Sequence, residues 1–136
     1  MSLTQQMYKH SHWGGTQFSH QKCRRLFDSY LLGDKRTLVI ILLCDPDPYG
    51  IIFGVKQELP FSDDSISTEL IWWVDEDRKD IRGLLWLYEA FEDWSKRVGV
   101  KYIQSGMLLD MADLSKFYER RGYKRVEQSY FKEINK

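Results

Sequence analysis

The stretch that decides the fold is ELIWWVDEDRKDIRG, residues 69–83. It starts as a strand-like apolar run, Leu70–Val74, and continues into a charged turn that leads into an amphipathic helix. The basic residues and the glycine of this turn are Arg78, Lys79, Arg82 and Gly83. The start of a helix offers unpaired amides and the positive end of the helix dipole. A basic, glycine-bearing turn at that position therefore favours binding of a phosphate-like anion.

The helix after this turn is predicted over Asp80–Val98, because apolar residues recur there at spacings of three and four. Gly99 is suited to end it. Strands are predicted before it at Ile66–Val74 and after it at Lys101–Leu109. A strand, a helix and a second strand in this order form a right-handed crossover between parallel strands.

The rest of the chain adds two helices and three strands. The predicted helices run from Thr16 to a stop at Gly33 and from Ala112 to Arg121, closed by Gly122. The predicted strands are Thr37–Cys44, which reads as buried on both faces, Ile51–Val55 and Lys124–Glu133. The turn at residues 45–50 joins the first two of these strands into an antiparallel hairpin. The fold class is therefore mixed α/β.

Composition limits the kind of protein. A chain of 136 residues, with 43% hydrophobic and 15% aromatic residues, fits one folded domain over residues 1–136. Twenty basic and twenty acidic residues give zero net charge, which argues against a nucleic-acid partner. Zero net charge also gives little repulsion between copies, so a homodimer is a hypothesis.

Cysteine and histidine positions indicate neither disulfides nor a metal. Cys23 and Cys44 are interpreted as small packing groups in a helix and a buried strand, which suits a reducing cytoplasm. His10, His12 and His20 lack partners at metal-ligand spacing, so no metal is expected. No apolar run reaches membrane-spanning length, so no membrane partner is expected.

The order of elements and two motifs resemble the GNAT superfamily of acyl-CoA-dependent N-acyltransferases. The turn Arg78-Lys79-Asp80-Ile81-Arg82-Gly83 is similar to the family's R/Q-x-x-G-x-G/A motif, and the segment Phe117–Tyr123 is similar to its L-Y-E-K-x-G-F motif. The similarity spans roughly residues 65–131. Ile81 stands where the family has its first glycine, and Asp110-Met111 stands where many members have an asparagine.

This resemblance implies a mostly antiparallel sheet of about six strands, flanked by three or four helices. Two central parallel strands, Ile71–Val74 and Tyr102–Gly106, would splay apart. The pantetheine arm of acetyl-CoA, the expected cosubstrate, would lie between them. The resemblance also implies the residues that bind this cosubstrate. They are Trp73, Val74, Arg78, Lys79, Asp80, Ile81, Arg82 and Gly83.

Two catalytic residues follow from the same resemblance. Tyr118 would give a proton to the departing thiolate, and Glu69 would take a proton from the attacking amine. Without the resemblance, each residue has an alternative interpretation. Tyr118 fits a core tyrosine equally well, and Glu69 fits a solvent-facing strand residue.

The implied function is transfer of an acetyl group from acetyl-CoA to a small-molecule or peptide amine. The alternatives are a GNAT-fold protein that is catalytically weak or inactive and serves as a CoA-binding or interaction module, and a nucleic-acid-binding module, which the zero net charge opposes.

Overall fold

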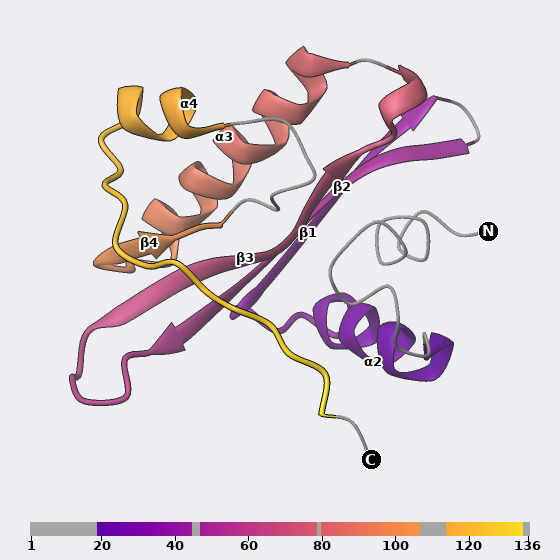
Figure 1. Cartoon of the computed structure of the whole chain (residues 1–136). Helices are drawn as coiled ribbons and strands as arrows, with labels where there is room; N and C mark the ends of the chain where they lie inside the picture. The colour runs from indigo at the N-terminus through magenta and orange to yellow at the C-terminus, as the bar shows by residue number, and fades with distance from the viewer. Residues whose placement is uncertain (1–18, 45–46, 79, 107–113, 135–136) are drawn as a thin grey trace.

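The computed structural model describes residues 19–44, 47–78, 80–106 and 114–134 (Figure 1). In chain order its elements are α2 (His20–Leu31), β1 (Thr37–Cys44), β2 (Asp47–Glu58), β3 (Ser65–Val74), the 3-10 turn η1 (Glu76–Arg78), α3 (Ile81–Arg97), β4 (Tyr102–Gln104) and α4 (Ser115–Arg120).

The strands form one mixed sheet in the order β1-β2-β3-β4. β1 pairs with β2 and β2 with β3 in antiparallel fashion, whereas β3 and β4 are parallel. The predicted hairpin and the predicted parallel crossover through α3 are therefore confirmed. The parallel pairing is short and joins only Ile66–Thr68 to Tyr102–Gln104.

α3 and α4 lie on one side of the sheet and α2 on the other (Figure 1). The α3 side carries most of the core, in which Tyr88 and Phe91 are fully buried together with Ile52 of β2. On the α2 side, Phe27 packs edge-on against Phe53, with 6.0 Å between ring centroids. Neighbouring residues of β2 thus face opposite helices, as strand alternation requires.

Close contact between α3 and the sheet depends on Gly54. A methyl group added there would come within 2.6 Å of the Phe91 ring. The glycine therefore removes a side chain that would hold the helix away from β2. Nearby, the Ser67 and Ser95 hydroxyls share a buried hydrogen bond of 2.7 Å between β3 and α3.

The three glycines predicted to end helices, Gly33, Gly99 and Gly122, all have positive φ, at 85°, 76° and 87°. This left-handed backbone is favourable for glycine and ends a helix efficiently. Helix boundaries within the described residues agree with the predictions to within a few residues. Residues 16–18 and 107–113, which include parts of two predicted helices and one strand, lie outside the described residues.

Some sequence predictions were wrong. Residues 124–133 are irregular and exposed rather than a strand. A strand needs an adjacent strand, and in the part of the chain that the structure describes β4 offers only three residues for pairing. Fewer strands are therefore present in the described ranges than the six expected.

β1 is also less buried than predicted, because its second half is exposed and includes Ile41, Leu43 and Cys44. Cys44 is therefore not the buried packing group that its apolar neighbours suggested. β2 begins at Asp47, earlier than the predicted Ile51, because Asp47 and Pro48 pair with Cys44 and Leu43 across an irregularity in the register.

None of the helices in the described ranges is both long and apolar enough to cross a membrane.

Candidate functional site

The candidate site starts where β3 and β4 separate. Their last paired residues are Thr68 and Gln104, so Glu69 and Ser105 are the first residues beyond the pairing. There the Glu69 Oε1 atom accepts hydrogen bonds from the Ser105 hydroxyl at 3.1 Å and from the Gly106 amide at 3.2 Å. The Glu69 carboxylate thus binds polar groups at the point where the pairing between β3 and β4 ends.

A β-bulge next to Glu69 changes which residues face α3. The pairing of β2 with β3 passes from Gly54–Glu69 directly to Phe53–Ile71, which leaves one extra residue in β3. Ser67 and Trp72 both bond to α3, the latter by an indole N–H that donates to the Leu84 carbonyl at 2.9 Å. Residues five apart share a strand face only when an extra residue shifts the alternation.

Tyr118 reaches the same point from α4. Its hydroxyl oxygen lies 2.9 Å from that of Ser105, and it also donates to the Gly106 carbonyl at 3.2 Å. Its ring packs against Tyr88 and Trp72, with centroids 5.7 and 6.3 Å away. The two residues predicted to be catalytic, Glu69 and Tyr118, are therefore connected through Ser105. Ser105 was not identified from the sequence, because it is a lone serine inside the predicted strand Lys101–Leu109 and belongs to no recognisable pattern, whereas the structure ends this strand at Gln104.

Burial sets the protonation states of both groups. It raises the pKa of Glu69 to about 7, although the hydrogen bonds from Gly106 and Ser105 act in the opposite direction. Burial also raises the pKa of Tyr118 above its usual value, so this phenol is protonated at neutral pH. Near neutrality the site therefore pairs a carboxylate that can accept a proton with a hydroxyl that can donate one.

Further hydroxyls and charges hold α4 against α3. Tyr123 donates to Glu92 Oε2 at 2.9 Å, and Arg121 bonds to the other oxygen of the same carboxylate. The Tyr88 hydroxyl is fully buried beside them and has no hydrogen-bond partner in the described part of the chain. These contacts hold α4, which carries Tyr118, against α3.

The start of α3 is the second part of the predicted site, and a side chain of the protein occupies its anion position. Asp80 caps the helix and accepts a 2.8 Å hydrogen bond from the Gly83 amide. Its other carboxylate oxygen accepts a 2.9 Å bond from the Tyr49 hydroxyl. The hydrogen bonds from Gly83 and Tyr49 lower the pKa of Asp80, so it is charged at neutral pH.

The remaining predicted cosubstrate residues are arranged in two groups. Arg78, Ile81 and Arg82 are exposed around the turn, with the Arg78 guanidinium 5.3 Å from the centre of the Tyr49 ring. Trp73 and Val74 bury their side chains on opposite faces of the sheet, so they offer only backbone groups to a ligand. Lys79 lies outside the described residues.

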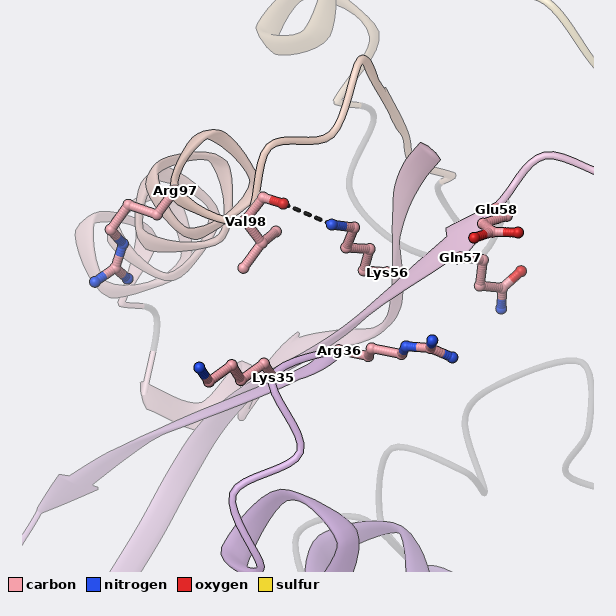
Figure 2. A pocket seen from close by; sticks show the side chains of 7 residues that line it. All are labelled: Lys35, Arg36, Lys56, Gln57, Glu58, Arg97 and Val98. Carbon is pink, nitrogen blue, oxygen red and sulfur yellow. Dashed lines mark hydrogen bonds between the residues drawn. The ribbon is translucent and has the colours of Figure 1, made fainter. Parts of the chain in front are cut away.

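A basic hollow of about 450 Å³ lies at the other end of α3. Figure 2 shows its cations pointing apart, since Lys56 turns to the Val98 carbonyl, to which it donates at 2.7 Å, and the Arg36 and Arg97 side chains extend in different directions. The cations therefore do not converge on one anion. Within the described ranges no cluster of His, Cys, Asp or Glu is suited to a metal. His10 and His12 lie outside those ranges.

No protein-family model and no curated protein matches this sequence. Solved structures match the fold over nearly the whole chain. A transcriptional regulator from Bacillus halodurans is 15% identical, with a TM-score of 0.73 over 96% of this chain and 91% of that one. The enzyme AAC(6')-Iy, solved with the bisubstrate analog CoA-S-monomethyl-acetylneamine, is 13% identical, with a TM-score of 0.68 over 97% and 89%.

A GNAT family acetyltransferase from Staphylococcus aureus is 14% identical, with a TM-score of 0.62 over 97% of this chain and 89% of that one. At such low identity these similarities concern the fold. They agree with the resemblance found in the two sequence motifs and with the separation of β3 and β4. This chain has the fold of the GNAT acetyltransferases, in a form divergent in sequence.

Proposed function

We propose that this protein is an N-acyltransferase that moves the acetyl group of acetyl-CoA to an amine. The observation that carries the proposal is the connection of Glu69 to Tyr118 through Ser105, at the opening between β3 and β4. The complex of AAC(6')-Iy with a CoA-containing analog supports a CoA thioester as the acyl donor.

Glu69 acts as the general base. An amine is protonated at neutral pH and cannot attack a carbonyl carbon in that form, so one proton must leave first. With a pKa of about 7, the Glu69 carboxylate takes this proton at physiological pH and releases it again.

Tyr118 acts as the general acid. When the bond between the acyl carbon and sulfur breaks, the leaving thiolate needs a proton. The buried Tyr118 hydroxyl keeps its proton at neutral pH, because burial raises its pKa, and it gives this proton to the sulfur.

The acyl donor would lie along β3 and reach the start of α3. The backbone of Trp73 and Val74 would pair with the pantetheine arm, in the manner of an added strand. Arg78, Lys79 and Arg82 would meet the phosphates beside the backbone of residues 80–83. This end of the site fits less well, since Asp80 already binds the Gly83 amide.

We propose a small-molecule or peptide amine as the acceptor. Neither a nucleic acid nor a membrane is proposed as a partner. We place the protein in the cytoplasm, and a homodimer remains a hypothesis.

The second candidate function is that of a GNAT-fold protein that transfers no acyl group and serves as a CoA-binding or interaction module. The Asp80 carboxylate favours it, because a phosphate at the start of α3 would have to displace this charge.

Calorimetric titration with acetyl-CoA and with CoA separates the two candidates. The proposed enzyme should release or take up heat on binding and should gain about 2.7 kcal/mol of stability at a ligand concentration one hundred times the Kd. An absence of both effects at millimolar ligand would exclude the enzyme. In an assay of released thiol with a panel of amines, Tyr118→Phe should then lower kcat and leave the affinity for CoA nearly unchanged.

A further inference from the structure

Ser105 lies between the proposed base and the proposed acid and bonds to both. Its hydroxyl oxygen is 3.1 Å from Glu69 Oε1 and 2.9 Å from the Tyr118 hydroxyl oxygen. The side chain is half-buried, at the first position where β4 has left β3. A serine hydroxyl both donates and accepts, so it can pass a proton between two neighbours.

The direction of these hydrogen bonds depends on the charge of Glu69. An ionised carboxylate only accepts, so Ser105 donates to Glu69 and Tyr118 donates to Ser105. When Glu69 is protonated it can donate to Ser105, which then donates to Tyr118. In that state the Tyr118 hydroxyl has the Gly106 carbonyl as its acceptor, at 3.2 Å. Both protonation states of Glu69 are thus fully hydrogen-bonded.

We propose that Ser105 returns a proton from Glu69 to Tyr118 after each acyl transfer, which restores the base and the acid together. The proposal rests on the function proposed above, because the step starts from the two groups that the transfer has changed.

The step balances. After the transfer, Glu69 holds one proton taken from the amine, and Tyr118 is a phenolate because it gave its proton to the sulfur. The Ser105 O–H bond breaks as its proton moves to the phenolate, and a new Ser105 O–H bond forms with the proton of Glu69. The products are a carboxylate, an unchanged serine and a phenol. The other proton that the ammonium group loses passes through Glu69 to solvent before the attack, so the amide keeps one N–H, and no redox partner is involved.

The transfer is downhill and removes an unfavourable charge. A carboxyl group with a pKa of about 7 gives its proton readily to a phenolate, whose parent phenol is a much weaker acid. Tyr118 is half-buried among aromatic rings, where a phenolate is poorly solvated. A route through Ser105 supplies the proton without admitting water to this position.

The groups around this route come from three segments. α3 contributes Tyr88, whose hydroxyl is buried, and α4 contributes Tyr118 itself. Tyr123 follows α4, and its hydroxyl is bonded to Glu92, the carboxylate that also holds Arg121. Within the described ranges no cation forms an ion pair with Glu69, so its titration is governed by burial and by the Ser105 and Gly106 donors.

The first test needs no substrate. Carbon-13 NMR of the glutamate carboxyl groups, with Glu69→Gln to assign the signal, follows the titration of Glu69 in the full-length protein. Ser105→Ala removes a donor to the charged form, so the pKa of Glu69 should rise by roughly 0.5–1 pH unit. Ser105→Thr keeps the hydroxyl and should leave that pKa close to the wild-type value. An equal pKa in the wild type and Ser105→Ala would overturn the proposed link.

The second test measures turnover from pH 6 to 9 with acetyl-CoA and an amine that the wild type accepts. Ser105→Ala should lower kcat roughly 10- to 100-fold, with the KM for acetyl-CoA changed less than about twofold, and should move the acidic limb of the pH profile upward. Ser105→Thr should recover kcat to within about threefold of the wild type. Melting curves check that both variants fold.

Different outcomes overturn different statements. If the wild type acetylates amines and Ser105→Ala has the same kcat across the pH range, the return step is wrong and the proposed function stands. If the wild type acetylates no amine in the panel, the proposed function fails and the return step fails with it. If Ser105→Thr is as slow as Ser105→Ala, the hydroxyl is not what matters, and the relay is overturned as well.

Discussion

At the opening between β3 and β4, donors converge on the Glu69 carboxylate, whereas at the start of α3 a carboxylate of the protein already fills the anion position. At the first end, the Ser105 hydroxyl and the Gly106 amide bond to Glu69, and the Tyr118 hydroxyl bonds to Ser105. At the second end, the Gly83 amide and the Tyr49 hydroxyl both bond to Asp80. Under the proposed function, the first end transfers protons, and the second must exchange a partner before it can hold a phosphate.

The two ends also differ in the effect of nearby charges. Residues 75–83 include four acidic and three basic side chains, so the predicted phosphate turn has no excess of positive charge. The pKa of Glu69, in contrast, is raised mainly by burial. Chemistry and cosubstrate affinity can therefore be tested by separate variants.

The largest expected effect is on the rate. Glu69→Gln keeps an oxygen that can accept from Ser105 and Gly106, yet the amide cannot take a proton from the amine. We expect kcat to fall on the order of 100-fold or more, with CoA affinity nearly unchanged. The wild-type rate should rise as pH increases through about 7, where Glu69 becomes ionised, and the variant should lack this rise.

Rates measured from pH 5.5 to 9 with one amine would check this prediction. Glu127→Gln is a matched control, because it is the same change at an exposed position beyond α4. A Glu69→Gln enzyme with the wild-type pH profile would show that another group is the base.

The same substitution should have the opposite effect on stability. The pKa of Glu69 is raised in the folded protein from 4.5 to about 7, so the folded state binds more protons than the unfolded state between these values. Stability due to this group is therefore complete below about pH 4.5 and is lost as pH rises through 7. Glu69→Gln avoids this loss and should raise the free energy of unfolding at pH 8 by about 1–3 kcal/mol.

Urea unfolding of both proteins at pH 5 and pH 8 measures this difference. The advantage of the variant should shrink at pH 5. A variant that is less stable than the wild type at pH 8 would show that the ionised carboxylate contributes more through its hydrogen bonds than it costs by burial.

Features with a local cause could be predicted from the sequence, and features that depend on distant partners could not. The apolar spacing of α3 and the glycine after it are local, and both predictions were correct. The sequence of residues 124–133 predicts a strand, but a strand also needs a partner, and the described part of β4 has only three residues. Glu69 and Tyr118 were named through the resemblance, whereas their link through Ser105 depends on where β3 and β4 separate.

The role of Asp80 could have been predicted from the sequence. An aspartate directly before a helix usually caps it by accepting from an amide two or three residues later, and Gly83 is at that distance. Asp80 is among the predicted cosubstrate residues only because of its position in the motif that resembles the GNAT turn. The capping preference would have identified it as a competitor for the same amide.

The smallest expected effect tests that competition. Asp80→Asn keeps a side-chain oxygen able to cap α3, so the helix should remain, while the negative charge at the anion position is removed. If phosphates approach this turn, the affinity for CoA should rise about 3- to 10-fold, since a charge near a helix start contributes on the order of 1 kcal/mol. Asp77→Asn is the matched control, because it removes the same charge from an exposed neighbour of the turn that does not cap α3.

Calorimetric titration of both variants with CoA at two salt concentrations separates the possible outcomes. Equal gains in both variants would mean that only the net charge matters, and a gain confined to Asp80→Asn would place the phosphates at the Gly83 amide. No gain in either variant would mean that CoA does not use the start of α3, and the open end of the site between β3 and β4 would then have to account for its binding.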